Sequence, residues 1–164
     1  NRTLPGTING VYTCTGDEHD AVGQIIEEPK TRIEMMQRRM NKLKLAKKEL
    51  PIPKLVGPED AELTIVSWGS NYGAVVEAME KLNLESKKVN FLCLEYLFPF
   101  HNKEVKELLV GSKKLVLLEC NYSGQLGELI AEQTGIMIED KILRYDGNPF
   151  TINKVYEELK KRLN

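Results

Sequence analysis

The feature that most constrains the fold is an alternation of short apolar runs with amphipathic stretches in the later part of the chain. The apolar runs occupy residues 62–68, 88–94, 114–119 and 141–145. The amphipathic stretches that follow them occupy residues 71–82, 102–110, 123–133 and 151–163. Strands with continuous apolar centres are typical of parallel sheets that are covered on both faces. We therefore predict a three-layer α/β domain with a mostly parallel sheet, helices on both faces and right-handed crossovers.

Each expected helix begins near a residue type that suits the N-cap or the first turn of a helix. These residues are Asn71, Asn102, Ser123 and Thr151. Their side-chain oxygens accept hydrogen bonds from the first backbone N–H groups of a helix. The capping pattern supports the helix assignment independently of the apolar periodicity.

The first 57 residues follow a different pattern, so we expect an arm or linker at 1–57 and the α/β domain at 58–164. Turn dipeptides are frequent before residue 28. Between Pro29 and Leu50, apolar residues recur at spacings of three and four among lysines and arginines. This predicts one basic amphipathic helix at about 30–50, and we favour a linker helix packed on its own protein over a membrane-binding or partner-binding helix.

Composition excludes several functional classes. Lysine and arginine total 23 and aspartate and glutamate total 24, so the net charge is −1. That balance argues against binding to nucleic acid or to an anionic membrane. The three cysteines include no CxxC pair, which argues against a zinc site or an iron–sulfur cluster on this chain. Cys93 and Cys120 lie in apolar runs and are expected in the core. We expect a cytoplasmic protein. Because the chain starts at Asn1 inside a motif-rich stretch, we also expect it to be a fragment of a longer protein.

Three loops follow the expected strands at the edge where open α/β sheets bind ligands. In the loop at 67–73, glycines precede a helix, which fits either an anion site or tight strand-to-helix packing. The loop at 119–125 gathers an amide, a phenol and a hydroxyl, which fits either a hydrogen-bonding interface or a ligand contact. In the loop at 98–101, the aromatic pair is expected to pack at the domain edge and His101 to lie at the surface.

The densest polar cluster is at 15–20, where three carboxylates flank His19. Consecutive side chains point in different directions, so we favour a solvated turn over a metal or acid/base site. No Ser–His–Asp or Cys–His arrangement and no dinucleotide fingerprint is present. The residues alone therefore indicate a binding or assembly domain.

Read together, five segments resemble a known family over essentially the whole chain. They are the segments at 15–20, 66–73, 96–100, 119–126 and 145–150. In this order they resemble the C-terminal, transketolase C-terminal-like domain of the alpha subunit of 2-oxoacid:ferredoxin oxidoreductases. The resemblance implies an oxidoreductase that decarboxylates a 2-oxoacid oxidatively to acyl-CoA and transfers electrons to ferredoxin.

The resemblance also implies which groups and partners belong to the complex. The parent complex would use thiamine diphosphate, Mg and an iron–sulfur cluster, none of them bound by this chain, together with coenzyme A and ferredoxin. The partners would be a beta subunit and the remaining alpha and gamma domains, assembled as a dimer of heteromers. The fragment is expected to be inactive alone, with no catalytic and no metal-binding residue.

The residues that we expect to face other domains or the substrate lie on polar loops beside these motifs. They are Glu18, His19, Asp20, Ser67, Trp68, Asn121, Tyr122, Ser123 and Gln125. A fragment should also expose an apolar docking surface, for which the candidates are Met35, Met36, Met40, Phe98 and Phe100. The alternatives are a stand-alone small-ligand or nucleotide-binding module of flavodoxin-like type and a dimerisation domain without a ligand.

Overall fold

The computed structural model describes residues 3–163, and the chain divides into two units between Glu49 and Leu50. The first unit consists of a loop segment, which carries one antiparallel bridge between His19 and Ile25, and the helix α1 (Pro29–Glu49). Pro29 fits the first helical turn because proline lacks only an N–H that has no intrahelical partner there. None of the residues of α1 is buried.

The second unit is built on a five-stranded sheet in the order β1-β3-β2-β4-β5. The strands are β1 (Leu55–Val56), β2 (Leu63–Trp68), β3 (Val89–Leu94), β4 (Leu115–Glu119) and β5 (Lys141–Leu143). Strands β2 to β5 run parallel, while β1 pairs antiparallel with β3. The prediction of a mostly parallel sheet is confirmed. The sequence did not reveal β1, because two apolar residues between breaker residues carry no periodicity.

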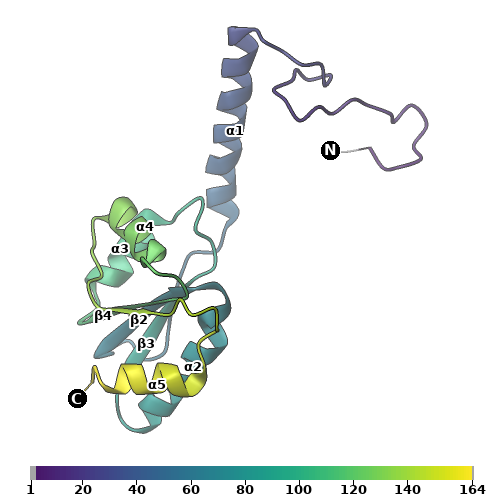
Figure 1. Ribbon diagram of the computed structural model, residues 1–164. Coiled ribbons are helices and arrows are strands. Elements are labelled where there is room, and N and C mark those ends of the chain that lie inside the picture. Colours follow the sequence, from purple (N-terminus) through teal and green to yellow (C-terminus); the bar gives the residue numbers. More distant parts are fainter. Residues whose placement is uncertain (1–2, 164) are drawn as a thin grey trace. The chain divides into compact units, whose positions relative to one another are not determined.

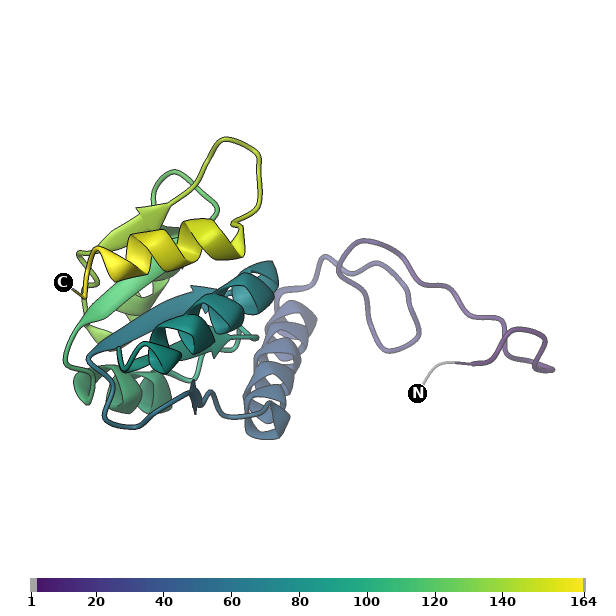
Figure 2. The same ribbon diagram turned by 90° about the horizontal axis from the view of Figure 1, so that it is seen from below.

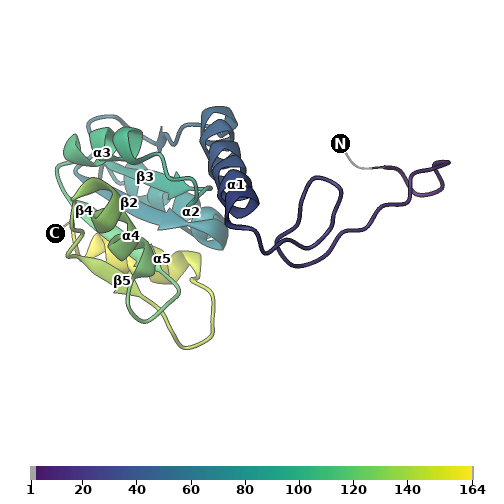
Figure 3. The same cartoon turned by 90° about the horizontal axis from the view of Figure 1, so that it is seen from above.

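Four helices cover the two faces of the sheet, as predicted (Figure 1). Helices α2 (Tyr72–Leu84) and α5 (Ile152–Lys160) lie side by side on one face, seen from below in Figure 2. Helices α3 (Asn102–Val110) and α4 (Gln125–Thr134) pack together on the other face, seen from above in Figure 3. Each face has its own apolar core, centred on Phe91 with α2 and α5 and on Leu92 with α3 and α4.

The helix starts match the predicted caps only in part. Thr151 is confirmed, since its side chain accepts a hydrogen bond from the backbone N–H of Lys154. Asn102 is the first residue of α3 and so lies in the first turn, one of the two positions predicted for it. Ser123 is wrong as a cap, because Gly124 occupies that position before α4 with a φ of 79°. A left-handed backbone conformation favours glycine, so the turn before α4 depends on Gly124.

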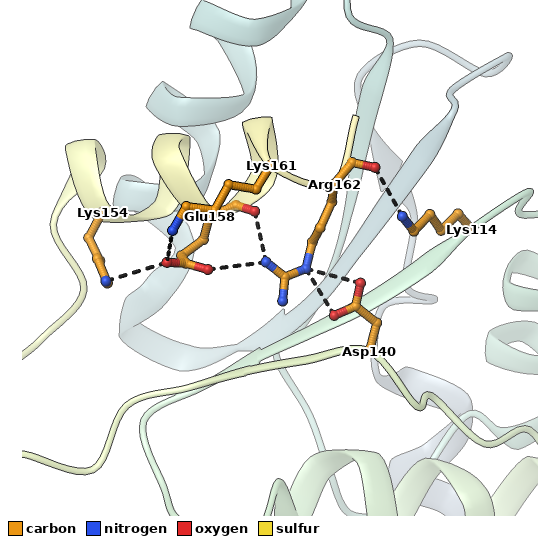
Figure 4. Close-up of polar contacts among 6 residues, drawn as sticks. All are labelled: Lys114, Asp140, Lys154, Glu158, Lys161 and Arg162. Atoms are coloured by element: carbon orange, nitrogen blue, oxygen red, sulfur yellow. Dashed lines mark hydrogen bonds and ion pairs between the residues drawn. The ribbon is translucent and has the colours of Figure 1, made fainter. Parts of the chain in front are cut away.

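A polar network fixes the end of α5 to the amino-terminal edge of the sheet (Figure 4). Its members are Lys114, Asp140, Lys154, Glu158, Lys161 and Arg162. The guanidinium of Arg162 donates to both carboxylate oxygens of Asp140, at 2.9 and 3.0 Å, and also pairs with Glu158 at 3.2 Å. Hydrogen bonds from Lys161, Arg162 and Lys154 lower the pKa of Glu158 to about 2.

Candidate functional site

The candidate site lies at the carboxyl ends of β2 and β4 and is organised by a buried carboxylate. Glu119, the last residue of β4, is fully buried. Its Oε1 accepts hydrogen bonds from Trp68 Nε1 at 3.0 Å and Asn121 Nδ2 at 2.9 Å. The backbone N–H of Leu126 donates to both carboxylate oxygens, at 3.1 and 2.9 Å. One side chain thus joins the end of β2, the loop after β4 and the first turn of α4.

A second chain of hydrogen bonds links the same two strands deeper in the edge. The buried hydroxyl of Ser67 donates to the backbone carbonyl of Leu118 at 2.6 Å and accepts from Asn71 Nδ2 at 3.0 Å. Asn71 Oδ1 in turn accepts from the Cys120 thiol at 3.4 Å. Asn71 therefore precedes α2 without capping it, because its side chain forms hydrogen bonds with Ser67 and Cys120 across the sheet edge.

The loop after β4 is shaped by Asn121. Its side-chain oxygen accepts from the backbone N–H groups of Gly124 and Gln125, at 2.6 and 3.4 Å. This turn places Tyr122 at the surface, where its ring meets the ring of Tyr145 edge to face, with centroids 5.0 Å apart. Tyr122 and Tyr145 thus form an exposed aromatic pair, and the backbone that carries Tyr122 is held by the hydrogen bonds of the Asn121 side chain.

The space between the two loops is small. A cavity of about 150 Å³ is lined by Trp68, Gly69, Ser70, Asn71, Cys120 and Asn121. Ligand pockets usually measure about 300–1,000 Å³. The described polar groups of this edge mostly bond to one another, so the arrangement is suited to presenting a rigid surface rather than to enclosing a substrate.

The predicted site residues fall into two groups. Ser67, Trp68, Asn121, Tyr122, Ser123 and Gln125 come together at this edge of the sheet. Glu18, His19 and Asp20 lie in the other unit, where they have local roles. Asp20 Oδ1 accepts from the backbone N–H groups of Val22 and Gln24, and the ring of His19 bonds to the carbonyl of Asp20 at 2.7 Å.

Glu18 connects the loop segment of its unit to α1. Arg39 of α1 forms two hydrogen bonds with its carboxylate, and Arg32 lies 3.6 Å away. The bond to Arg39 lowers the pKa of Glu18. Within residues 3–163, no cluster of three histidine, cysteine, aspartate or glutamate side chains is arranged to hold a metal ion.

Three predicted environments are wrong. Cys120 is exposed rather than in the core, because β4 ends one residue before it. Phe100 and His101 are buried rather than at the surface, since the loop after β3 folds back and Phe100 joins the core beneath α3. Of the predicted apolar surface residues, Met36, Met40 and Phe98 are exposed.

The sequence motif contained Glu119, but reasoning from the sequence did not single it out. A carboxylate that ends a fully apolar strand, followed two residues later by asparagine, was the available signal. Buried charges require partners, so this residue implied donors nearby. One of these donors is Trp68, which lies 51 residues earlier in the chain.

Comparison with known proteins gives concordant results. The family described as pyruvate:ferredoxin oxidoreductase core domain II matches residues 61–155. The 2-oxoacid:ferredoxin oxidoreductase subunit alpha of Saccharolobus solfataricus is 37% identical over 149 residues, which cover 89% of this chain and 24% of the relative. The chain therefore spans about a quarter of the length of this curated relative.

Solved structures extend the likeness to the fold. A 2-oxoglutarate:ferredoxin oxidoreductase from Magnetococcus marinus, solved with 2-oxoglutarate, coenzyme A and succinyl-CoA bound, matches 99% of this chain and 28% of its own chain. The TM-score is 0.80 and the identity 29%. A split-gene transketolase, described as an inactive beta4 tetramer, covers 67% of this chain with a TM-score of 0.52 and 20% identity, and it bears on the fold alone.

Proposed function

Because the chain belongs to the pyruvate:ferredoxin oxidoreductase core domain II family and to the alpha subunits of 2-oxoacid:ferredoxin oxidoreductases, we propose that it is an assembly domain of such a subunit. The proposed parent enzyme converts a 2-oxoacid to acyl-CoA by oxidative decarboxylation and passes electrons to ferredoxin. The domain supports that reaction by joining other parts of the complex, and it has no turnover alone.

The cofactors of the reaction belong to other parts of the proposed complex. Thiamine diphosphate with Mg needs oxygen ligands gathered around the cation, and an iron–sulfur cluster needs cysteine thiolates. Residues 3–163 contain no group of side chains arranged for a metal, so the described residues do not fit these groups. No step of the chemistry is therefore assigned to this chain.

The observation that carries the proposal is the buried Glu119 network beneath exposed aromatic side chains. Trp68, Tyr122 and Tyr145 are 41%, 76% and 66% exposed. Aromatic residues dominate the energetics of protein interfaces, and rigid ones lose little entropy on binding. A surface of this kind, held by a fully hydrogen-bonded carboxylate, is suited to a permanent neighbour.

The arm is proposed to contribute to the same assembly. Helix α1 exposes Ile33, Met36, Met40 and Leu45. These apolar side chains are suited to cover a neighbouring domain or subunit. We further propose that Glu18, His19 and Asp20 face neighbouring domains, since their turn is already ordered by local hydrogen bonds. A beta subunit and the remaining alpha and gamma domains are the proposed partners.

The location of the protein is also part of the proposal. We propose a cytoplasmic complex, a dimer of heteromers, that binds neither nucleic acid nor membrane. Among residues 3–163, no helix has both the length and the apolar character that crossing a bilayer requires.

Substitutions in the whole enzyme test the proposal. Tyr122→Ala and Tyr145→Ala together should lower the fraction of alpha subunit that co-purifies with its beta subunit, and reduce 2-oxoacid-dependent ferredoxin reduction in parallel. Leu84→Ala is the matched control, because Leu84 is exposed at the opposite, amino-terminal edge of the sheet. Full assembly and full turnover of the double variant would refute the proposal. A stand-alone ligand-binding module would instead leave assembly with other subunits undetectable in all variants.

A further inference from the structure

The strand β5 forms an open edge of the sheet. It is the last strand in the order, and the strand that pairs with it within residues 3–163 is β4 (Figure 3). The backbone N–H of Arg144 donates to the carbonyl of Glu119 at 3.0 Å. Backbone groups alternate in direction along a strand, so those of Ile142 also face β4, whereas those of Lys141 and Leu143 face away from it. This edge therefore offers backbone donors and acceptors to a further strand.

The lysine of β5 does not protect this edge. Exposed edges of sheets are often guarded by a lysine side chain. The side chain of Lys141 instead lies against Gly124 and Gly127 at the start of α4, and its ammonium group donates to the carbonyl of Ser123 at 3.3 Å. The open edge is consequently not covered by this side chain.

A groove of about 720 Å³ lies beside the open edge. Residues 141–146, which include all of β5, contribute part of its lining, and α5 with the turn before it contributes the rest. From Thr151 to Arg162 the α5 side is about 16 Å long, at about 1.5 Å per residue. An extended chain of about five residues has the same length, at about 3.3 Å per residue. The groove therefore suits a short added strand.

The groove carries an excess of positive charge. Four basic side chains and two carboxylates line it. Of the carboxylates, Asp146 is paired with Arg144 at 2.9 Å. Glu158 is paired with Lys154 at 3.4 Å and with Arg162 at 3.2 Å (Figure 4). A segment with acidic side chains would be attracted to this groove, whereas the equally basic edge of a second copy of this chain would be repelled.

The groove is continuous with the proposed assembly surface. Tyr145 lines the groove and is exposed, and its ring meets that of Tyr122 at a centroid distance of 5.0 Å. A neighbour that covers this aromatic pair therefore lies beside the open edge of β5.

From these observations we infer that β5 pairs with an extended, acidic segment of a neighbouring subunit, which adds one strand to the five-stranded sheet. The outward backbone groups of Lys141 and Leu143 bond to the backbone of that segment. Its acidic side chains face the basic groove beside α5. This inference rests on the proposed assembly function and specifies what the neighbour contributes.

Hydrogen–deuterium exchange at single-residue resolution tests the pairing, by comparing this chain alone with the same chain in the whole enzyme. The amides of Lys141 and Leu143 should exchange at least about tenfold more slowly in the enzyme, because pairing gives each of them a hydrogen bond. The amide of Ile142 faces β4 in both samples and is the internal control. Equal exchange of Lys141 and Leu143 in the two samples would overturn the inference. Slow exchange already in the chain alone would also overturn it, because two copies would then pair through β5.

A proline in β5 tests the backbone bonds independently. Leu143→Pro removes an outward N–H, and proline is tolerated in edge strands where the N–H faces away from the ladder. Leu143→Ala is the matched control, because it shortens the same side chain and keeps the N–H. We expect Leu143→Pro to lower the fraction of alpha subunit that co-purifies with its beta subunit at least about fivefold relative to Leu143→Ala. Circular dichroism of each chain verifies that both variants are folded, and similar co-purification of the two would contradict the inference.

The acidic character of the segment is tested at Lys154. Lys154→Gln removes one exposed charge of the groove and should weaken subunit association about threefold to fivefold at low salt, and less at high salt. Lys81→Gln, exposed in the last turn of α2, is the control and should leave association unchanged. Unchanged association of the Lys154→Gln variant would refute the acidic character of the segment.

These outcomes are distinguishable from failure of the proposed function. Loss of assembly in the Tyr122→Ala and Tyr145→Ala double variant, with full assembly of Leu143→Pro, would leave the assembly function standing and overturn the pairing of β5. Full assembly of the double variant would refute the assembly function itself.

Discussion

Replacement of Glu119 by glutamine tests how strongly the carboxylate holds the edge of the sheet. The substitution keeps the shape of the side chain and removes its charge. Three donors meet the carboxylate, from Trp68, Asn121 and the backbone of Leu126. The amide group of glutamine offers one acceptor oxygen, and its NH₂ group would face one of these donors.

The expected loss follows from the contacts. One unpaired buried donor costs about 1–3 kcal/mol. The other two bonds change from charge-assisted to neutral, which costs about 1 kcal/mol each. The neutral side chain is easier to bury, which offsets part of this loss. We expect Glu119→Gln to lower the free energy of unfolding by about 2–4 kcal/mol, a large part of the roughly 5–15 kcal/mol of a typical domain.

Urea denaturation, followed by circular dichroism and tryptophan fluorescence, measures this loss. Trp68 is the single tryptophan of the chain, and its indole bonds to Glu119 directly, so its emission should also shift in the folded variant. Glu132→Gln, at an exposed position on α4, serves as the control and should change the free energy of unfolding by less than about 0.5 kcal/mol. A stability of Glu119→Gln within that margin, with unchanged emission, would refute the reasoning.

Three further predictions concern the packing and the charges of the α/β unit. Gly127→Ala should lower the free energy of unfolding by about 1 kcal/mol in urea, because the added Cβ would lie 2.8 Å from Leu117 Cδ2; an increase in stability would contradict this close packing. Thr151→Ala should cost about 1 kcal/mol through loss of the α5 cap, while Thr151→Ser should keep most of it; equal losses in the two variants would argue against capping. The pKa of Glu158 is lowered from 4.5 to about 2, so its stabilising effect is complete above about pH 5 and is lost as the pH falls toward 2. In Glu158→Gln, the fall in stability between pH 5 and pH 3 should be smaller by about 1 kcal/mol after allowance for solvent screening, and an unchanged pH profile would contradict this.

The sequence was sufficient for the architecture because the apolar runs of a parallel sheet are long and continuous. The runs that became β2, β3 and β4 differ little from their observed bounds. Local chemistry was also sufficient at Thr151, whose cap depends only on residues three positions apart. In both cases the determining interactions are short-range or are repeated along an element.

Predictions failed where a neighbouring side chain competes for the same backbone group, or where packing in the folded domain decides which residues are buried. Ser123 is of a residue type that commonly caps helices. The side-chain oxygen of Asn121 instead accepts a hydrogen bond from the backbone N–H of Gly124, and α4 begins after Gly124. His101 was expected at the surface, and the packing of Phe100 into the core buries it. The role of Glu119 required knowledge that β2 and β4 are neighbours, which their order in the sequence does not reveal.

Hydrogen–deuterium exchange tests the central claim most directly, by comparing this chain alone with the same chain in the whole enzyme. If the carboxyl edge of the sheet is the assembly surface, peptides covering residues 68–72 and 121–126 should exchange markedly more slowly in the enzyme. Peptides covering residues 111–114, at the opposite edge, should exchange equally in both. Equal exchange of the carboxyl-edge peptides in the two samples would contradict the assignment of this edge to assembly.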